Sequence, residues 1–138
     1  MSGSDWLILD THIWIWWVKQ DRQLSPVISR RLESTQARVA ISSISIYEAV
    51  LQICRGRVEI DLPLQKWLHV ATVAAGVEVL AINAEIATAA AGLPLHHGDP
   101  LDRIIIATAL HHDAEIASVD GHFPHYAALA GRLISDRN

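Results

Sequence analysis

Four acidic side chains give this chain its clearest capacity for chemistry: Asp10, Glu48, Asp102 and Asp120. Asp10 directly follows the apolar residues 6–9, and Asp120 follows Ile116-Ala117-Ser118-Val119. Glu48 and Asp102 each fall where we expect a helix to begin. Ligands of open α/β sheets gather beyond the carboxyl ends of the strands, where helix N-termini also point. Carboxylates brought together there repel one another, and a hard divalent cation such as Mg²⁺ or Mn²⁺ relieves that repulsion.

Three of these acids also have a purely structural explanation. Ser45 and Glu48 have the spacing of a capping box, in which a glutamate reaches back to the amide of the residue that caps the helix. Asp102 could complement the dipole of its helix, and Asp99 could cap that helix. Asp120, followed by glycine, suits an ordinary turn. An aspartate that ends a buried strand, however, is costly to keep charged unless something compensates it.

Other residues near the acids could support them. The hydroxyls of Thr11 and Ser118 could orient a carboxylate or a metal-bound water, or they could simply form turns. Three arginines could hold a phosphate backbone or remain solvated charges: Arg55, Arg57 and Arg103. Zinc is a weaker alternative for the clustered histidines, because neither an HExxH pattern nor a cysteine pair accompanies them: His96, His97, His111 and His112.

Three tryptophans follow the first apolar run closely: Trp14, Trp16 and Trp17. Such rings stack on nucleic-acid bases in some proteins and pack into a core or an interface in others, so both interpretations stay open. Together with the apolar excess, three exposed tryptophans would give more apolar surface than a monomer can bury. We therefore expect a homodimer that also offers a hydrophobic groove to a partner helix.

The elements that must position these residues alternate between strands and helices. Short apolar runs predict strands at residues 6–9, 38–41, 77–82, 115–119 and 132–134. Capping residues and glycines predict helices from Ser25 to about Thr35, Ser45 to about Arg55, Pro63 to Gly76, Asn83 to Gly92, and about Asp102 to His112. This alternation favours an α/β fold with parallel pairing and helices on both faces of the sheet.

Length and composition limit the class of protein. The 138 residues fit a single domain, 1–138, in which we expect residues 1–4 to be an appended or disordered tail. Hydrophobic residues make up 51% of the chain, yet no apolar stretch reaches the roughly 18 residues that span a bilayer. The lone Cys54 excludes an internal disulfide and suits a reducing cytoplasm. A net charge of −4 disfavours a duplex binder that relies on phosphate contacts alone.

These residues, in this order, resemble the PIN-domain ribonucleases, and more closely the VapC-type toxins of bacterial toxin–antitoxin pairs. The similarity extends from residue 6 to about residue 134. Its most specific segment is residues 97–103, which match the family's His-x-Asp-Pro-Phe-Asp-Arg with Leu101 in the place of phenylalanine. The other matching segments are residues 9–12 with the following Trp16 and Trp17, residues 42–48, 56–58, 93–96, and 118–120 with Phe123.

The resemblance implies a three-layer α/β/α PIN-like fold around a mainly parallel sheet, and a Mg²⁺- or Mn²⁺-dependent endoribonuclease that hydrolyses RNA. It places the family's four metal-binding acids on Asp10, Glu48, Asp102 and Asp120. The family's metal-contacting hydroxyl falls on Ser118, where threonine is commoner, and Gln52 stands where close relatives often carry lysine. The resemblance also implies a cognate VapB-type antitoxin and a homodimer.

Two other classes of function stay open on the residues alone: a phosphoacceptor α/β domain, either a receiver or a phosphatase, and a non-catalytic binding module. A phosphoacceptor receiver would need a late lysine, whereas the only lysines are Lys19 and Lys66. A phosphatase of the Asp-x-Asp type would need a second aspartate after Asp10, where the chain has Thr11 and His12. A non-catalytic binding module on the same fold would have no need of four mutually repelling carboxylates.

Overall fold

A computed structural model describes residues 5–95 and 100–136 of the chain. Within these residues, five parallel strands form one sheet in the order β3-β2-β1-β4-β5. The strands are β1 (Trp6–Leu9), β2 (Arg38–Ser42), β3 (Glu78–Leu80), β4 (Glu115–Ala117) and β5 (Leu133–Ile134). The helices are α1 (Thr11–Lys19), α2 (Pro26–Ser34), α3 (Ser43–Cys54), α4 (Leu64–His69), α5 (Ala84–Gly92) and α6 (Pro100–His111). The predicted α/β/α fold with a parallel sheet is confirmed.

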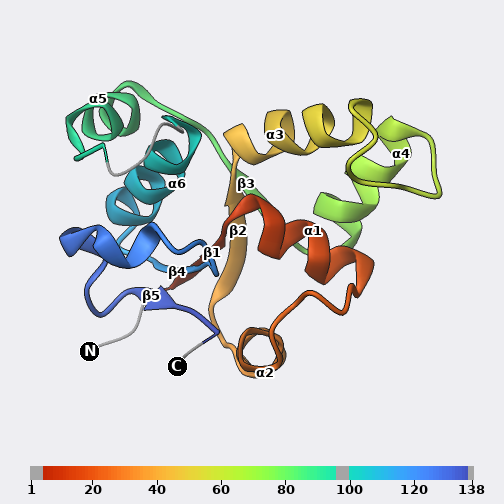
Figure 1. The fold of residues 1–138 in the computed structure, drawn as a ribbon, viewed down its shortest axis with the longest axis horizontal. Coiled ribbons are helices and arrows are strands. Elements are labelled where there is room, and N and C mark those ends of the chain that lie inside the picture. Colours follow the sequence, from red (N-terminus) through yellow and green to blue (C-terminus); the bar gives the residue numbers. More distant parts are fainter. Residues whose placement is uncertain (1–4, 96–99, 137–138) are drawn as a thin grey trace.

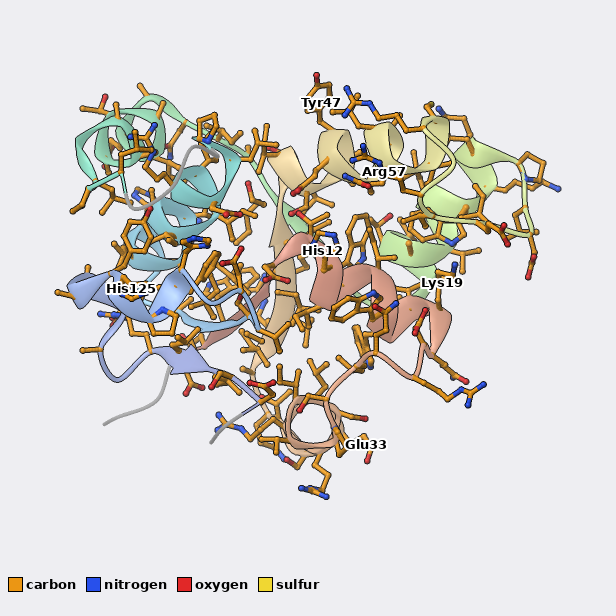
Figure 2. All side chains as sticks on the ribbon, viewed as in Figure 1. His12, Lys19, Glu33, Tyr47, Arg57 and His125 are labelled. Atoms are coloured by element: carbon orange, nitrogen blue, oxygen red, sulfur yellow. The ribbon has the colours of Figure 1, made fainter. Side chains whose placement is uncertain are left out.

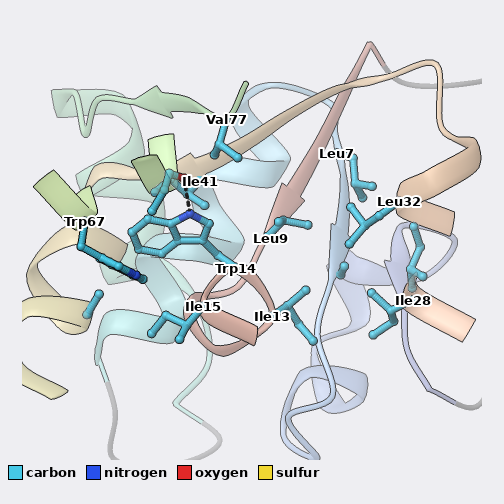
Figure 3. Close-up of a cluster of buried hydrophobic side chains, with 14 residues drawn as sticks. Leu7, Leu9, Ile13, Trp14, Ile15, Ile28, Leu32, Ile41, Trp67 and Val77 are labelled. Atoms are coloured by element: carbon cyan, nitrogen blue, oxygen red, sulfur yellow. Dashed lines mark hydrogen bonds between the residues drawn. The ribbon is translucent and has the colours of Figure 1, made fainter. Parts of the chain in front are cut away.

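Helices cover both faces of the sheet, with α5 and α6 on one side and α1, α3 and α4 on the other (Figure 1). Because successive side chains of a strand point to opposite faces, β1 supports two cores. Leu7 and Leu9 join the larger one, against α1 to α4 (Figure 3), whereas Ile8 joins the core beneath α6. Short 3₁₀ turns, η2 (Phe123–His125) and η3 (Ala127–Leu129), close the second core.

Helix α1 was not predicted, and it decides where the tryptophans lie. β-branched and aromatic residues dominate residues 11–19, and such residues form helices weakly on their own. Asp10 caps the helix, and burial against the sheet supplies the remaining stability. The expectation that Trp14 is exposed is wrong: its ring is completely buried, and its Nε1 donates to the Ala71 carbonyl oxygen at 2.8 Å (Figure 3). A buried indole that keeps its hydrogen bond is a core residue.

Helix α3 begins earlier than predicted. Ser42, not Ser45, is its N-cap, and the Ser42 hydroxyl accepts from the Ile44 amide at 3.2 Å. Glu48 is therefore the sixth residue of the helix and cannot be the third residue of a capping box, so that structural explanation is wrong. Ser45 and Glu48 lie three residues apart on the same face of α3, which packs against α1.

The other predicted elements are present with different ends. The predicted strand 77–82 is shorter, and the helix after Pro63 turns into a π-helical segment, η1 (Val70–Ala74), before Gly76. Gly76 has a φ of 71°, the left-handed backbone expected of a glycine that follows a helix. Asn83 caps α5 and Ser25 caps α2, as predicted. No helix within the described residues is both long enough and apolar enough to cross a membrane.

The register of the sheet brings Asp10, Ser118 and Ser42 to the same level at the ends of β1, β4 and β2. Leu9 pairs with Ala117 and Ile8 pairs with Ala40. Counting onward along the parallel strands places Asp10 beside Ser118 on one side and Ser42 on the other. The Asp10 amide extends the ladder by donating to the Ala117 carbonyl oxygen at 3.1 Å. The starts of α1 and α3 therefore meet at the carboxyl edge of the sheet.

Candidate functional site

A cavity of ≈ 390 Å³ lies at this edge of the sheet and brings together all four predicted acids. We call it the acidic cavity; its lining residues are Asp10, Thr11, His12, Trp16, Glu48, Asp102, Val119, Asp120 and His122. They come from the ends of β1 and β4 and from helices α1, α3 and α6. His12 lies at the start of α1, near the centre of the molecule (Figure 2).

Asp10 is the most constrained of the four acids. Only 7% of it is exposed, its Oδ1 accepts from the Ile13 amide at 2.9 Å, and its Oδ2 accepts from the Ser118 hydroxyl. Burial raises the pKa of Asp10 to about 6, although these two hydrogen bonds and the nearby His12 oppose that rise; Asp120 adds to it by repulsion. The charged carboxylate is therefore held in place without being fully compensated.

Glu48 is held by a pair of hydroxyls across the α1–α3 contact. The Thr11 hydroxyl lies 2.5 Å from Glu48 Oε1 and 2.9 Å from the Ser45 hydroxyl. A hydroxyl carries a single proton and an ionised carboxylate only accepts, so Thr11 donates to Glu48 and Ser45 donates to Thr11. Thr11 and Ser45 are both buried, so water does not compete for these two hydrogen bonds. Glu48 thus lines the cavity and does not cap its helix.

Asp120 is positioned by a turn that begins at Ser118. The Ser118 hydroxyl, which donates to Asp10, also accepts from the Asp120 amide at 3.0 Å. Asp120 Oδ1 in turn accepts from the His122 amide at 2.8 Å and lies 3.1 Å from His122 Nδ1. The buried Ser118 hydroxyl therefore links the side chain of Asp10 to the backbone of Asp120.

Asp102 reaches the cavity from another helix. It lies in the first turn of α6, where the helix dipole favours a negative charge, and it is 8% exposed. Helix α6 packs against both α3 and β2, so the start of α6 is fixed relative to the other acids. The predicted cap Asp99 lies outside the residues that the structure describes.

The donor set suits a hard cation, although the acids do not form a finished metal site. Carboxylate and hydroxyl oxygens are the ligands that Mg²⁺ and Mn²⁺ prefer. Within residues 5–95 and 100–136, however, no three His, Cys, Asp or Glu side chains are arranged so that they could hold an ion as they stand. Asp10, Glu48 and Asp120 each direct an oxygen to a local hydrogen bond instead. The oxygen atoms of these residues fit such an ion in chemistry.

The three predicted arginines are not among the lining residues of the acidic cavity. Arg55 and Arg57 are exposed just after α3, where Figure 2 labels Arg57. Arg103 is partly buried on α6, next to Asp102 in the sequence. Sequence reasoning did not assign His12, Val119 or His122 to the site. Two of these could have been found from spacing alone, because each histidine follows a predicted acid by two residues.

Comparisons with known proteins agree with this geometry. The model of the PIN domain matches residues 7–129. Ribonuclease VapC22 of Mycobacterium tuberculosis is 30% identical over 115 residues, which cover 83% of this chain and 86% of that protein.

Solved structures share the fold. A toxin–antitoxin complex from Klebsiella pneumoniae contains a chain with a TM-score of 0.67 and 20% identity, over 94% of this chain and 97% of that chain. VapBC2 of Rickettsia felis, bound to a DNA fragment from its promoter, matches with the same TM-score and identity, over 94% of this chain and 98% of that one.

Proposed function

Because the chain belongs to the PIN-domain family and its four acids line one cavity, we propose that it is a metal-dependent endoribonuclease of the VapC type. The observation that carries the proposal is the meeting of Asp10, Glu48, Asp102 and Asp120 at the carboxyl edge of the sheet. The substrate is RNA, and the reaction is hydrolysis of a phosphodiester bond. The toxin role rests on the relative VapC22 and on the toxin–antitoxin complexes that share this fold.

Asp10, Asp102 and Asp120 are the proposed ligands of a Mg²⁺ or Mn²⁺ ion, which Glu48 would bind directly or through water. When bound, such an ion lowers the pKa of a coordinated water and neutralises charge on the phosphate. The side chains of this protein supply position. Ser118 holds Asp10 and the backbone of Asp120, and Thr11 holds Glu48.

RNA contacts outside the cavity remain a proposal for Arg55, Arg57 and Arg103, which could each hold a phosphate of the flanking strand. A VapB-type antitoxin is the proposed protein partner, on the analogy of the complexes above. We further propose a homodimer in the cytoplasm, where Cys54 would stay reduced.

The first test concerns the metal and Asp10 together. We expect millimolar Mn²⁺ to raise the Tm of the protein through mass action, and calorimetry to show binding. Asp10→Asn should abolish RNA cleavage and weaken Mn²⁺ binding while keeping the far-UV spectrum. Asp61→Asn, which changes an exposed aspartate outside the cavity, is the matched control. Cleavage by Asp10→Asn at the parent rate would defeat the assignment.

A second test concerns Glu48. Since Glu48 does not cap α3, Glu48→Gln should lower the rate of cleavage at nearly constant stability, whereas a capping role would lower stability and keep the activity. Glu33→Gln on α2 serves as control, because Glu33 is exposed and lies far from His12 (Figure 2). Both are read by RNA cleavage on gels and by thermal unfolding. A stable, fully active Glu48→Gln enzyme would remove Glu48 from the site.

A further inference from the structure

Trp16 lines two cavities at once. Besides the acidic cavity, it lines a cavity of ≈ 500 Å³ formed with residues 22–27, which join α1 to the start of α2. Val119 also lines both. Trp16 and Val119 therefore lie between the two cavities. We call this neighbouring cavity the side cavity.

The three tryptophans of α1 differ in what surrounds them. Trp14 is buried in the core with its indole N–H bonded to Ala71. Trp17 is partly buried and lines a separate cavity of ≈ 300 Å³ with Val70 of η1. Trp16 is partly buried as well, and its ring centre lies 5.7 Å from that of His12, one helical turn earlier, at an interplanar angle of 47°. Trp16 and His12 thus present aromatic surface to the acidic cavity.

Arg22 places a guanidinium at the side cavity, which the acidic Asp136 also lines. Its side chain is exposed and lines the side cavity. Among the described residues it pairs with no carboxylate, including Asp136, which lines the same cavity. The start of α2 adds no open donor through Val27, because the Ser25 hydroxyl already accepts from that amide at 3.2 Å. An aromatic wall beside an unpaired guanidinium suits a base followed by a phosphate.

We propose that Trp16 forms a stacking subsite for one nucleobase next to the scissile phosphate, and that Arg22 contacts the phosphate beyond that base. This proposal rests on the proposed ribonuclease function and defines its substrate further. A base must leave its own helical stack before it can lie against Trp16, so the subsite selects unpaired RNA. Stacking on an aromatic face tolerates any base, so preference at this position comes from stacking strength.

Binding measurements on a non-cleaving background test the subsite. In Asp10→Asn protein, fluorescence anisotropy with a short single-stranded RNA that the parent cleaves should show Trp16→Leu binding about 5- to 150-fold more weakly. Trp17→Leu is the matched control, since it removes the next indole of the same helix and lines neither cavity. Trp16→Phe, which keeps an aromatic ring, should restore part of the affinity. Thermal unfolding confirms that each variant is folded.

The RNA can be varied as well. Replacing each nucleotide near the cleavage position by an abasic one should reveal one position where loss of the base weakens binding to Asp10→Asn protein. At that position the abasic change should cost nothing further in the Trp16→Leu protein, because the two share one interaction. Equal losses in both backgrounds, or equal effects of Trp16→Leu and Trp17→Leu, would overturn the subsite. So would loss of antitoxin binding with RNA binding kept.

Arg22 has its own readout. Arg22→Ala should lower the slope of log affinity against log salt by roughly one unit, equally for all RNA sequences. Arg30→Ala, an exposed arginine of α2 outside both cavities, should leave the slope unchanged. If the slope for Arg22→Ala equals that of the parent, Arg22 does not contact a phosphate of the RNA.

Activity separates this proposal from the one on which it rests. If the parent cleaves RNA with Mn²⁺ and Trp16→Leu keeps the parent kcat/KM and metal affinity, the subsite is wrong and the ribonuclease stands. If the parent neither binds nor cleaves RNA, both are wrong.

Discussion

Asp10 is the residue in which structural and chemical roles coincide. The same carboxylate caps α1 through the Ile13 amide, accepts from Ser118, and lines the acidic cavity. A cap alone would not require burial, and burial is what raises its pKa to about 6. The protein therefore holds a carboxylate whose charge is costly unless a cation lies beside it.

This pKa predicts how stability depends on pH. In EDTA, the folded protein should hold a proton on Asp10 that the unfolded chain loses as pH rises from about 4 to about 6. Stability due to this group therefore falls over that window and stays constant above it, by up to about 3 kcal/mol in all. Asp10→Asn removes this titration. The variant's free energy of unfolding in urea should therefore rise relative to that of the parent as pH increases from 4 to 7. Asp61→Asn should show no such gain, and parallel curves for Asp10→Asn and parent would contradict the shifted pKa.

Helix α3 shows how an element, and not a residue, carries a side chain to the site. Ser42 ends β2 and caps α3, so the sheet register determines where the helix starts. Almost two turns further along α3, Glu48 accepts a hydrogen bond from Thr11, the first residue of α1. Because α1 follows β1 and α3 follows the adjacent strand β2, the two helices bring Glu48 to the cavity.

The cap of α3 is open to a direct test. Ser42→Ala should lower the free energy of unfolding by ~0.5–2 kcal/mol, because the Ile44 amide loses its acceptor. Ser45→Ala should instead release Thr11 and reduce RNA cleavage, since Ser45 bonds Thr11 and caps nothing. Chemical denaturation and cleavage rates measured on both variants separate the two effects. A larger stability loss in Ser45→Ala with unchanged cleavage would restore the capping box.

At the scale of the whole molecule, apolar surface remains exposed even though Trp14 is buried. Among the residues that the structure describes, large apolar side chains with more than half of their surface exposed are Tyr47, Val73 and Leu95. They lie on or beside different helices, and apolar side chains scattered in this way do not mark an interface by themselves. We retain the homodimer as a prediction that the family resemblance implies.

Light scattering tests the assembly. The chain has a mass of 15.2 kDa, so a homodimer should give twice this value, about 30 kDa, at micromolar concentration. Adding a VapB-type antitoxin should raise the mass further. A species of single-chain mass that does not change with added antitoxin would remove both the dimer and the pairing.

The sequence alone was enough to identify the parallel α/β sheet, most of its helices and the acids at the strand ends. These features depend on local patterns: apolar runs, caps such as Ser25 and Asn83, and glycines such as Gly76. Asp10 and Asp120 could be predicted because an acid that closely follows a buried parallel strand lies at the carboxyl edge of the sheet.

Tertiary structure decided what depends on contacts between distant segments. Helix α1 forms from weak helix formers because the sheet buries one side of it, and the same packing makes Trp14 a core residue while Trp16 faces the cavities. The true cap of α3 depended on where β2 ends, which no local motif distinguished among its serines. The hydrogen bonds from Thr11 to Glu48 and from Ser118 to Asp10 join residues 37 and 108 positions apart, so only the register of the folded sheet could bring them together.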